Sequence, residues 1–357
     1  MRLNELLAIT IRRGASDIHL KIGSPPAFRI GGNIVVSNMP PLISRDMEGL
    51  VSEMRLKEGK KERLKKTGQV DVGYGISGVG RFRLNIYYQR DSLAIAGRFI
   101  PYSTPSMKEL NLPEIVEKIA LSQRGLVLVT GIAGSGKSTT LAAMVEIINK
   151  DRTVNIITVE DPIEYLFSDN KAIISQRQIG DDVSSFAEGL KGALRQDPNV
   201  ILVGEMRDRE TMHMALEAAE TGHVVISTLH TLDAAETVNR IISAFPLDQE
   251  NQIRKQLSTT LAAVICQRLI ENIDKTRLVS AIEIMITTEY IRTAITDPEK
   301  TSEIPRIIEM NRIYGMQTFD QSLMDLYERK LISLDKAREY ATHPDDFMLK
   351  VKGIQIR

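Results

Sequence analysis

The stretch that decides the fold runs from Gly125 to Asn149 and reads GLVLVT-GIAGSGKS-TTLAAMVEIIN. Its first six residues are apolar and rich in β-branched side chains. The next eight, Gly131–Ser138, match the pattern G-x-x-x-x-G-K-[ST], and the rest carry apolar residues at helical spacing. A strand, a glycine-rich loop and a helix in this order predict a phosphate-binding loop.

The loop has the residue types that a nucleoside triphosphate needs. Its glycines allow a tight turn that brings backbone N–H groups against phosphate oxygens at a helix N-terminus. Lys137 adds charge for the β- and γ-phosphates, and the Ser138 hydroxyl is placed to bind Mg²⁺. We expect ATP to be bound by Gly131, Gly134, Ser135, Gly136, Lys137, Ser138 and Thr139. The alternative, a glycine-rich turn with an incidental lysine, would need the four specified residues of this eight-residue pattern, and its flanking strand and helix, to arise by chance.

Composition bounds the class of protein. The 357 residues predict two domains with a helical extension. Lys and Arg together number 46, as do Asp and Glu, so no overall charge draws the protein to nucleic acid or an anionic membrane. The single cysteine, Cys266, excludes an intrachain disulfide and suits a reducing compartment. No signal pattern or membrane-length apolar run is present, so we expect a cytoplasmic protein without a membrane span.

The chain divides into four predicted regions. Residues 1–100 form a small α/β domain with a charged helix over 48–66 and antiparallel strands over 70–74, 80–88 and 94–99. Residues 101–113, which contain three prolines, form a hinge linker. Residues 114–290 form the nucleotide-binding core, and residues 291–357 a helical C-terminal region. Within the core, apolar periodicity predicts one helix over 249–270 that buries Cys266.

Polar residues follow three predicted strands of the core. Glu160, Asp161 and Glu164 follow the strand over 154–159, Glu205 follows the one over 200–203, and His230 follows the one over 224–228. Ligands of open parallel sheets bind at the carboxyl ends of strands. A carboxylate there can position water, and Glu205 matches the pattern whose carboxylate holds Mg²⁺ directly or through water. An ordinary acidic loop and a structural histidine remain alternatives.

Three arginines share neighbouring strands of the N-terminal domain. Arg81 and Arg83 lie two residues apart and so on one face, and Arg98 lies on the next strand. One explanation is that these arginines lie on a solvent-exposed sheet face and form weak surface ion pairs. A surface of guanidinium groups offered to phosphate is the functional alternative.

The motifs together resemble the secretion-type RecA-like ATPases, and most closely the type IV pilus retraction ATPases, which are PilT-like. The resemblance covers nearly the whole chain. It is carried, besides the phosphate loop, by GASDIHL at 14–20, VEDPIEY at 159–165, ALRQDP at 193–198, ILVGEMRD at 201–208, TGH at 221–223, HT at 230–231 and GMQTFD at 315–320.

The resemblance implies a PAS-like N-terminal domain, a RecA-like parallel-sheet ATPase domain and a homohexamer that hydrolyses ATP with Mg²⁺. It assigns Glu164 as the catalytic carboxylate, Glu205 as the Walker B glutamate and His230 as the histidine near the phosphates. Arg81 and Arg98 correspond to arginines that a neighbouring subunit or domain supplies to the nucleotide, which favours the functional alternative for them. The implied work is pilin disassembly and twitching motility, through an inner-membrane platform protein at the cytoplasmic face of the membrane.

The sequence departs from the family pattern in the phosphate loop, where ATP binding should survive, and in a late motif, which keeps another function open. The loop has Ile132-Ala133 where the family usually has Pro-Thr, and the late Ala-Ile-Arg motif appears as Tyr290-Ile291-Arg292. The altered 290–300 segment allows an accessory or regulatory retraction subunit, working with a paralogous retraction ATPase. Pilus assembly and type II secretion ATPases usually carry an extra N-terminal domain and a tetracysteine site. Both are missing here, which favours retraction.

Overall fold

The computed structural model describes residues 2–76, 80–100 and 104–353. Residues 101–103, the start of the predicted hinge, lie outside them. The chain divides into two compact units, one made of residues 1–103 with 164–166 and the other of residues 104–163 with 167–357. Each unit is described by itself.

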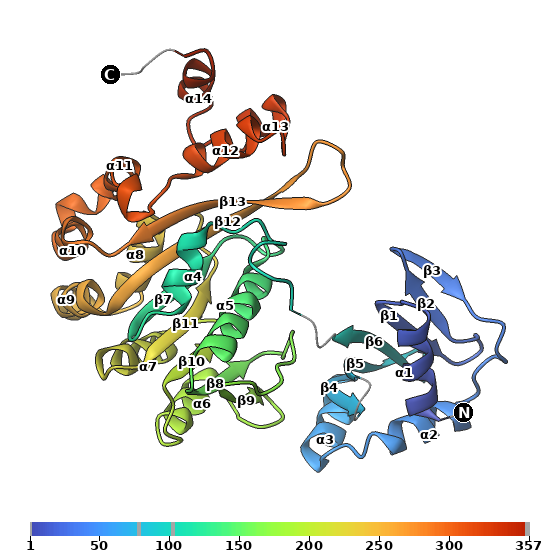
Figure 1. Cartoon of the computed structure of the whole chain (residues 1–357). Coiled ribbons are helices and arrows are strands. Elements are labelled where there is room, and N and C mark those ends of the chain that lie inside the picture. The colour runs from blue at the N-terminus through green and yellow to red at the C-terminus, as the bar shows by residue number, and fades with distance from the viewer. Residues whose placement is uncertain (1, 77–79, 101–103, 354–357) are drawn as a thin grey trace. The chain divides into compact units, whose positions relative to one another are not determined.

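The first unit contains a six-stranded antiparallel sheet in the order β3-β2-β1-β6-β5-β4. One face of the sheet is apolar and packs against the three helices (Figure 1). The helices are α1 (Leu3–Arg12), α2 (Ser44–Glu53) and α3 (Glu58–Thr67), and the strands are β1 (Asp17–Lys21), β2 (Ala27–Ile30), β3 (Asn33–Val36), β4 (Gln69–Ile76), β5 (Gly80–Gln89) and β6 (Ser92–Ile100).

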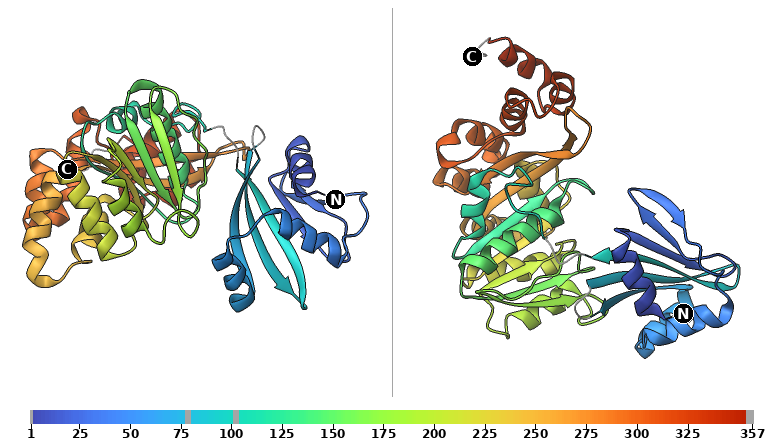
Figure 2. Two further views of the ribbon diagram at one scale, coloured as in Figure 1. Left: turned by 90° about the horizontal axis from the view of Figure 1, so that it is seen from below. Right: turned by 45° about the vertical axis from the view of Figure 1, so that its right-hand side comes forward.

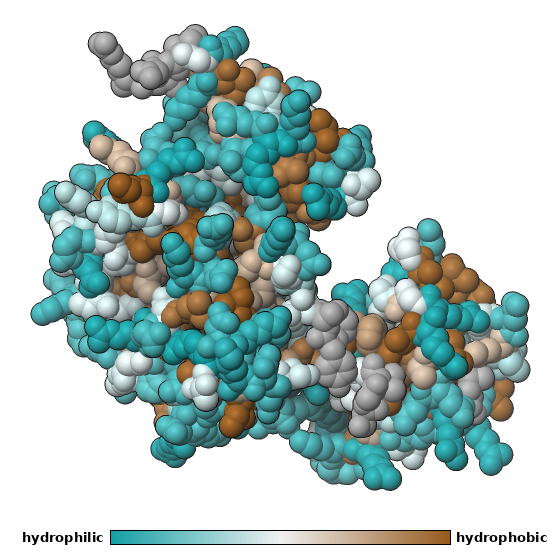
Figure 3. All heavy atoms as spheres, viewed as in Figure 1, coloured by the Kyte–Doolittle hydropathy of each residue, from teal (hydrophilic) through white to brown (hydrophobic). Residues whose placement is uncertain are grey.

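Strand β3 ends the sheet and is exposed along its whole length. Its apolar side chains Ile34, Val35 and Val36 remain 41–59% exposed, and Figure 3 shows apolar surface over this strand. The predicted single helix over 48–66 is wrong, because Arg55 adopts a left-handed φ of 48° and separates α2 from α3. The break turns Leu56 into the core, where burial of its side chain favours the interruption.

The second unit contains a seven-stranded sheet in the order β13-β12-β7-β11-β10-β8-β9. All neighbouring pairs are parallel except β12 with β13, a hairpin that extends past the other strands (Figure 2). The strands are β7 (Gly125–Thr130), β8 (Asn155–Glu160), β9 (Ile173–Gln178), β10 (Val200–Val203), β11 (Val224–Leu229), β12 (Leu261–Glu271) and β13 (Leu278–Ile286).

Helices cover both faces of this sheet, because alternate residues of its central strands are buried in two different cores. Val127 and Val129 pack with α4 and α5, whereas Leu126 and Leu128 pack with the later helices (Figure 1). The helices are α4 (Glu114–Ala120), α5 (Lys137–Asp151), α6 (Phe186–Ala193), α7 (Arg209–Glu220), α8 (Ala234–Ile242), α9 (Glu250–Thr260), α10 (Glu289–Thr296), α11 (Ile304–Met310), α12 (Phe319–Glu328), α13 (Leu334–Tyr340) and α14 (Pro344–Val351). In the described part of the chain, no helix combines the length and apolarity that crossing a membrane requires.

The predicted helix over 249–270 is wrong beyond Thr260, where the chain enters β12. This strand pairs with β7 on one side and β13 on the other, and is buried almost throughout. A short continuous apolar run, such as residues 261–266, fits a helix and a central strand equally well, and pairing with two neighbours decides for the strand. Cys266 is fully buried as expected, but in the sheet.

Candidate nucleotide site

The phosphate loop connects β7 to α5 through glycines in conformations that other residues rarely adopt. Gly131 has a φ of 139° and Gly136, which precedes the first residue of α5, a φ of 90°. A Cβ atom on Gly131 would overlap the carbonyl oxygen of Gln267 and lie 2.7 Å from Ser135 Oγ. Position 131 therefore requires glycine for both its backbone conformation and its contacts.

Two side chains of the loop point to an anionic ligand. Lys137 Nζ donates to the carbonyl oxygens of Gly131 at 2.7 Å and Ile132 at 2.9 Å, so its charge lies within the loop. Ser135 is 2% exposed, and its Oγ has no hydrogen-bond partner among the described residues. A buried hydroxyl without a partner is costly. Together with a helix N-terminus and a lysine, it fits the phosphate groups of a nucleotide.

The ends of β10 and β11 bring Glu205 and His230 together. The strands are parallel neighbours, and Ser227 and Thr228 donate side-chain hydrogen bonds of 2.7 Å to the carbonyl oxygens of Val203 and Gly204. Glu205 Oε1 then lies 3.0 Å from His230 Nε2, whose ring places Nδ1 3.5 Å from Lys137 Nζ. Three predicted site residues, from three different segments, therefore form one polar cluster.

Arg207 belongs to this cluster and was missed by the sequence argument. Its Nε lies 2.7 Å from Glu205 Oε2, so the glutamate is held from both sides. The sequence feature that could have identified Arg207 is its position two residues after Glu205. Since 71% of the Arg207 side chain is exposed, the pair orients the carboxylate more than it stabilises the fold.

Gln267 is a second residue that the sequence argument missed. It is 3% exposed on β12, where its Oε1 accepts from Thr140 Oγ1 at 2.8 Å and its Nε2 donates to Ser280 Oγ at 3.1 Å. The amide thereby ties the first turns of α5 to the β12–β13 hairpin. The signal was a polar residue directly after the six apolar residues of positions 261–266.

The acidic segment after β8 is only partly ordered by contacts within the second unit. Glu160 Oε1 accepts from Thr158 Oγ1 at 2.6 Å and from Gln176 Nε2 at 3.2 Å, a structural role. Glu164 is exposed and groups with the first unit. Its catalytic role stays a prediction.

The arginines of the first unit lie on the open face of its sheet. Arg98 Nε donates to Asp17 Oδ1 at 2.9 Å, and Arg29 Nε lies 3.4 Å from Asp17 Oδ2. Burial tends to raise the pKa of Asp17, but hydrogen bonds from Ser16 and Arg98 hold this pKa below its ordinary value. Arg81 is half-buried on the same face, two residues from Arg83. Their roles toward nucleotide stay predictions.

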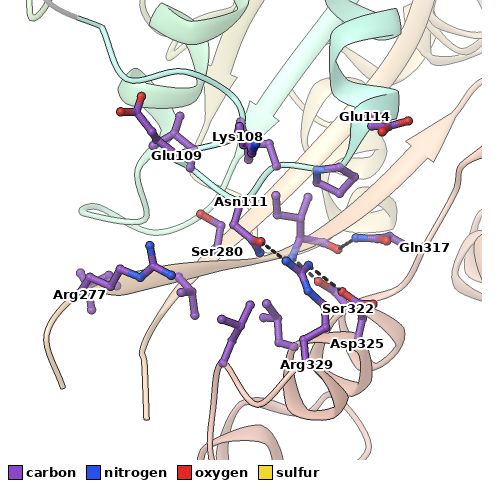
Figure 4. Close-up of a pocket in the computed structure, with 18 of the residues that line it drawn as sticks. Lys108, Glu109, Asn111, Glu114, Arg277, Ser280, Gln317, Ser322, Asp325 and Arg329 are labelled. Carbon is purple, nitrogen blue, oxygen red and sulfur yellow. Dashed lines mark hydrogen bonds and ion pairs between the residues drawn. The ribbon is translucent and has the colours of Figure 1, made fainter. Parts of the chain in front are cut away.

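The second unit also has a hollow of about 580 Å³ beside the described part of the linker (Figure 4). Arg329, which directly follows α12, spans it, donating to Asn111 Oδ1 at 2.7 Å while pairing with Asp325 at 3.2 Å. Leu112 is nearly buried in the core next to it. The second half of the predicted hinge is therefore attached to the second unit.

Comparison with known proteins agrees with the site. The family model described as "Type II/IV secretion system protein" matches residues 97–337. The chain is 42% identical to the type IV pilus retraction ATPase PilT of Pseudomonas aeruginosa, over 97% of this chain and all of that protein. It is 36% identical to the type IV pilus ATPase PilU of the same organism, over 99% and 92%.

A solved structure gives the same result. The pilus retraction motor PilT with bound ADP is 44% identical and superposes with a TM-score of 0.87, covering 97% of this chain and 98% of that one. The predicted α/β fold with a parallel ATPase sheet is confirmed, and so is the resemblance read from the motifs. The chain therefore belongs to the type II/IV secretion system protein family, among its pilus retraction ATPases.

Proposed function

We propose that this chain is an ATP-hydrolysing motor that works as a homohexamer and powers type IV pilus retraction. The observation that carries the proposal is the cluster of Lys137, at the start of α5, with Glu205 and His230, which follow β10 and β11. The likeness to PilT over the full length of both chains supports it.

ATP is bound by the phosphate loop, through backbone N–H groups and the side chains of Ser135, Lys137, Ser138 and Thr139. Lys137 Nζ now donates to two loop carbonyls, and it exchanges these bonds for phosphate oxygens when ATP is bound. Since both sets of partners are oxygen atoms, the exchange costs little rearrangement. The loop is therefore organised before the nucleotide arrives.

Ser138 and Glu205 are the residues that would hold Mg²⁺, Glu205 directly or through water. The ion would neutralise charge on the phosphate oxygens as the terminal phosphoryl group transfers. Arg207 and His230, on either side of Glu205, fix the direction of its carboxylate. This orientation is what a metal ligand needs from its neighbours.

Hydrolysis requires a positioned water and a counter-charge for the transition state. Glu164 orients the water, and His230 donates a hydrogen bond near the terminal phosphate. Arg81 and Arg98, supplied by a neighbouring subunit, stabilise the negative charge that develops on the transferred phosphoryl group. In the single chain, Arg98 is paired with Asp17, which holds its guanidinium ready on the open sheet face.

The motor acts on an inner-membrane platform protein at the cytoplasmic face of that membrane, with flexing of the 101–113 linker converting hydrolysis into movement. Because Asn111 and Leu112 are attached to the second unit, these two residues move with it. Nucleic acid is not a partner, since positive and negative side chains balance.

Two experiments test the proposal. Purified chain should hydrolyse ATP in the presence of Mg²⁺, and Glu164→Gln should abolish most of this activity. Wild-type protein no faster than the variant would contradict the catalytic part. Deleting the gene should leave cells with many pili and no twitching motility, whereas loss of pili would indicate an assembly motor.

One segment favours a second function, an accessory retraction subunit. Tyr290 on α10 is 70% exposed, and Arg292 pairs with Glu289 at 3.3 Å and donates to the Ser258 carbonyl oxygen at 3.2 Å. The retained arginine is thus partly occupied by contacts within the chain. If the chain works beside a paralogous retraction ATPase, the deletion should abolish retraction only under load.

A further inference from the structure

A buried carboxyl group lies on strand β13, outside the nucleotide cluster. Glu283 is 7% exposed, and its Oε1 accepts a hydrogen bond of 2.9 Å from the backbone N–H of Ala234. Ala234 is the first residue of α8 and is fully buried. The two residues are 49 positions apart, so the bond joins distant parts of the second unit.

The segment that Glu283 contacts carries His230. Residues 230–234 lead from the end of β11 into α8, and Thr231, Leu232 and Asp233 are hydrogen-bonded to residues of α8. The hydroxyls of Thr231 and Thr237 are 2.6 Å apart, and Glu236 both accepts from Leu232 N and donates its N–H to Asp233, each at 2.7 Å. These bonds fix the segment to the helix. The bond to Glu283 fixes it to the sheet.

The same part of the sheet supports the phosphate loop. Glu283 pairs in register with Cys266 on β12, and Cys266 pairs with Thr130, the last residue of β7 before Gly131. A short row across three strands therefore connects Glu283 to the start of the loop. Since Glu283 also contacts Ala234, the loop and the segment that carries His230 share one support.

The strands of this row also hold the C-terminal helices. Next to Glu283, the Ile282 N–H donates to Ser322 Oγ at 3.0 Å, and Gln317 Nε2 donates to the Ile282 carbonyl oxygen at 2.8 Å (Figure 4). On β12, Arg268 donates to the Tyr340 carbonyl oxygen at 2.7 Å and lies 3.7 Å over the ring of Phe319. These helices therefore contact Ile282, the residue next to Glu283 in the chain.

We propose that Glu283 is a positioning residue for ATP hydrolysis: its hydrogen bond to Ala234 holds the 230–234 segment on the sheet and thereby keeps His230 against Glu205. The inference rests on the proposed ATPase function. It assigns no contact with nucleotide to Glu283, which acts only through the segment.

The groups around Glu283 affect its protonation but not its ability to accept the hydrogen bond from Ala234. Burial raises its pKa to about 7, the Ala234 N–H lowers it, the nearby Asp233 carboxylate raises it, and Arg268 and the Cys266 thiol lower it. A neutral carboxyl group keeps a carbonyl oxygen, so either protonation state can accept from Ala234. The positioning contact is therefore available on both sides of neutrality.

The test is steady-state ATP hydrolysis by the full-length chain with Mg²⁺. We expect Glu283→Ala to lower kcat about tenfold or more and to change KM less than about twofold, because the segment contributes to turnover. Glu283→Gln, which keeps an acceptor of the same length, should keep kcat within about threefold of the wild type. Ile282→Val, a buried change next to Glu283 that faces the other core, is the matched control and should behave like the wild type.

A double-mutant cycle separates positioning from a general loss of structure. In a His230→Ala background, Glu283→Ala should change kcat by less than about twofold. The proposal would be overturned if the effects of Glu283→Ala and His230→Ala on kcat multiply. It would also be overturned if Glu283→Gln is as slow as Glu283→Ala, or if His230→Ala keeps the wild-type kcat. If Glu283→Ala does not fold, Ala234→Pro removes the donor at a helical position that suits proline and takes its place in the cycle.

These outcomes are distinct from failure of the proposed function. If the wild-type chain does not hydrolyse ATP, the ATPase proposal fails before Glu283 is tested. If the wild type hydrolyses ATP and Glu283→Ala does so equally well, only the role of Glu283 fails.

Discussion

His230 Nε2 lies 3.0 Å from Glu205 Oε1, and the opposite oxygen of the same carboxylate lies 2.7 Å from Arg207 Nε. The two strands that carry these residues are tied together by hydroxyl groups of Ser227 and Thr228. The carboxylate is therefore held by side chains whose own strands are fixed. Such pre-orientation allows a glutamate to act without rearrangement during catalysis.

Glu205→Gln tests this arrangement. The change keeps the shape of the side chain but removes its charge, so we expect ATP turnover to fall by roughly 10²–10³-fold, in line with loss of a catalytic carboxylate. Phosphate release should report the loss, while equilibrium binding of a fluorescent ATP analogue changes much less. Glu217→Gln, on the exposed face of α7, serves as the control and should turn over ATP normally.

Gln267→Ala should destabilise the second unit. Removing the buried amide leaves Thr140 and Ser280 each without a partner, which costs about 1–3 kcal/mol in free energy of unfolding. Urea unfolding should show this loss, and nucleotide affinity should fall because α5 begins at the phosphate loop. Gln252→Ala on exposed α9 should stay within about 0.5 kcal/mol of the wild type. Equal stability of the two variants would contradict the bracing role.

Gly131→Ala and Gly134→Ala form a matched pair. Both positions have a positive φ, but only at 131 would a Cβ atom meet neighbouring atoms within 4 Å. Gly134→Ala should cost about 1–2 kcal/mol from its left-handed backbone alone. Gly131→Ala should cost clearly more, because the Gln267 carbonyl oxygen must also move. Thermal unfolding without nucleotide measures both, and a smaller effect at 131 would be evidence against this geometry.

Glu283 should make stability depend on pH. Its pKa is raised from 4.5 to about 7 in the folded protein, so between these values the folded state binds the proton more strongly than the unfolded state. Stability therefore falls as pH rises through this window, by up to about 3 kcal/mol. Glu283→Gln does not titrate. Relative to the wild type, it should gain stability between pH 5 and pH 8, and parallel curves from denaturant unfolding would exclude the raised pKa.

Local patterns predicted the parts of the site that a short segment determines. The loop from Gly131 to Ser138 is such a segment, since its glycines and lysine follow one another. The cluster of Glu205 with His230 followed from one further rule, that polar residues after parallel strands share an edge of the sheet. Both could therefore be predicted without knowledge of distant contacts.

Contacts between distant segments could not be predicted from the sequence. The run from Leu261 to Glu271 is apolar over its first six residues, so its pattern does not separate a helix from a strand, and pairing with β7 and β13 makes it a strand. If that run is interpreted as a helix, the support that Gln267 gives to the phosphate loop cannot be predicted. The interruption at Arg55 was missed for a similar reason, because charged residues continue across it and only the burial of Leu56 favours the break.

The position of Cys266 has a practical consequence. The chain has one cysteine, it is fully buried on β12 between β13 and β7, and burial raises the pKa of its thiol well above the ordinary value. Since thiol reagents attack the thiolate, Cys266 should react with them only when the sheet opens. The rate at which the native protein is modified is thus a built-in measure of how often the middle of the ATPase unit unfolds. Each nucleotide state can be compared on that scale without introducing a probe.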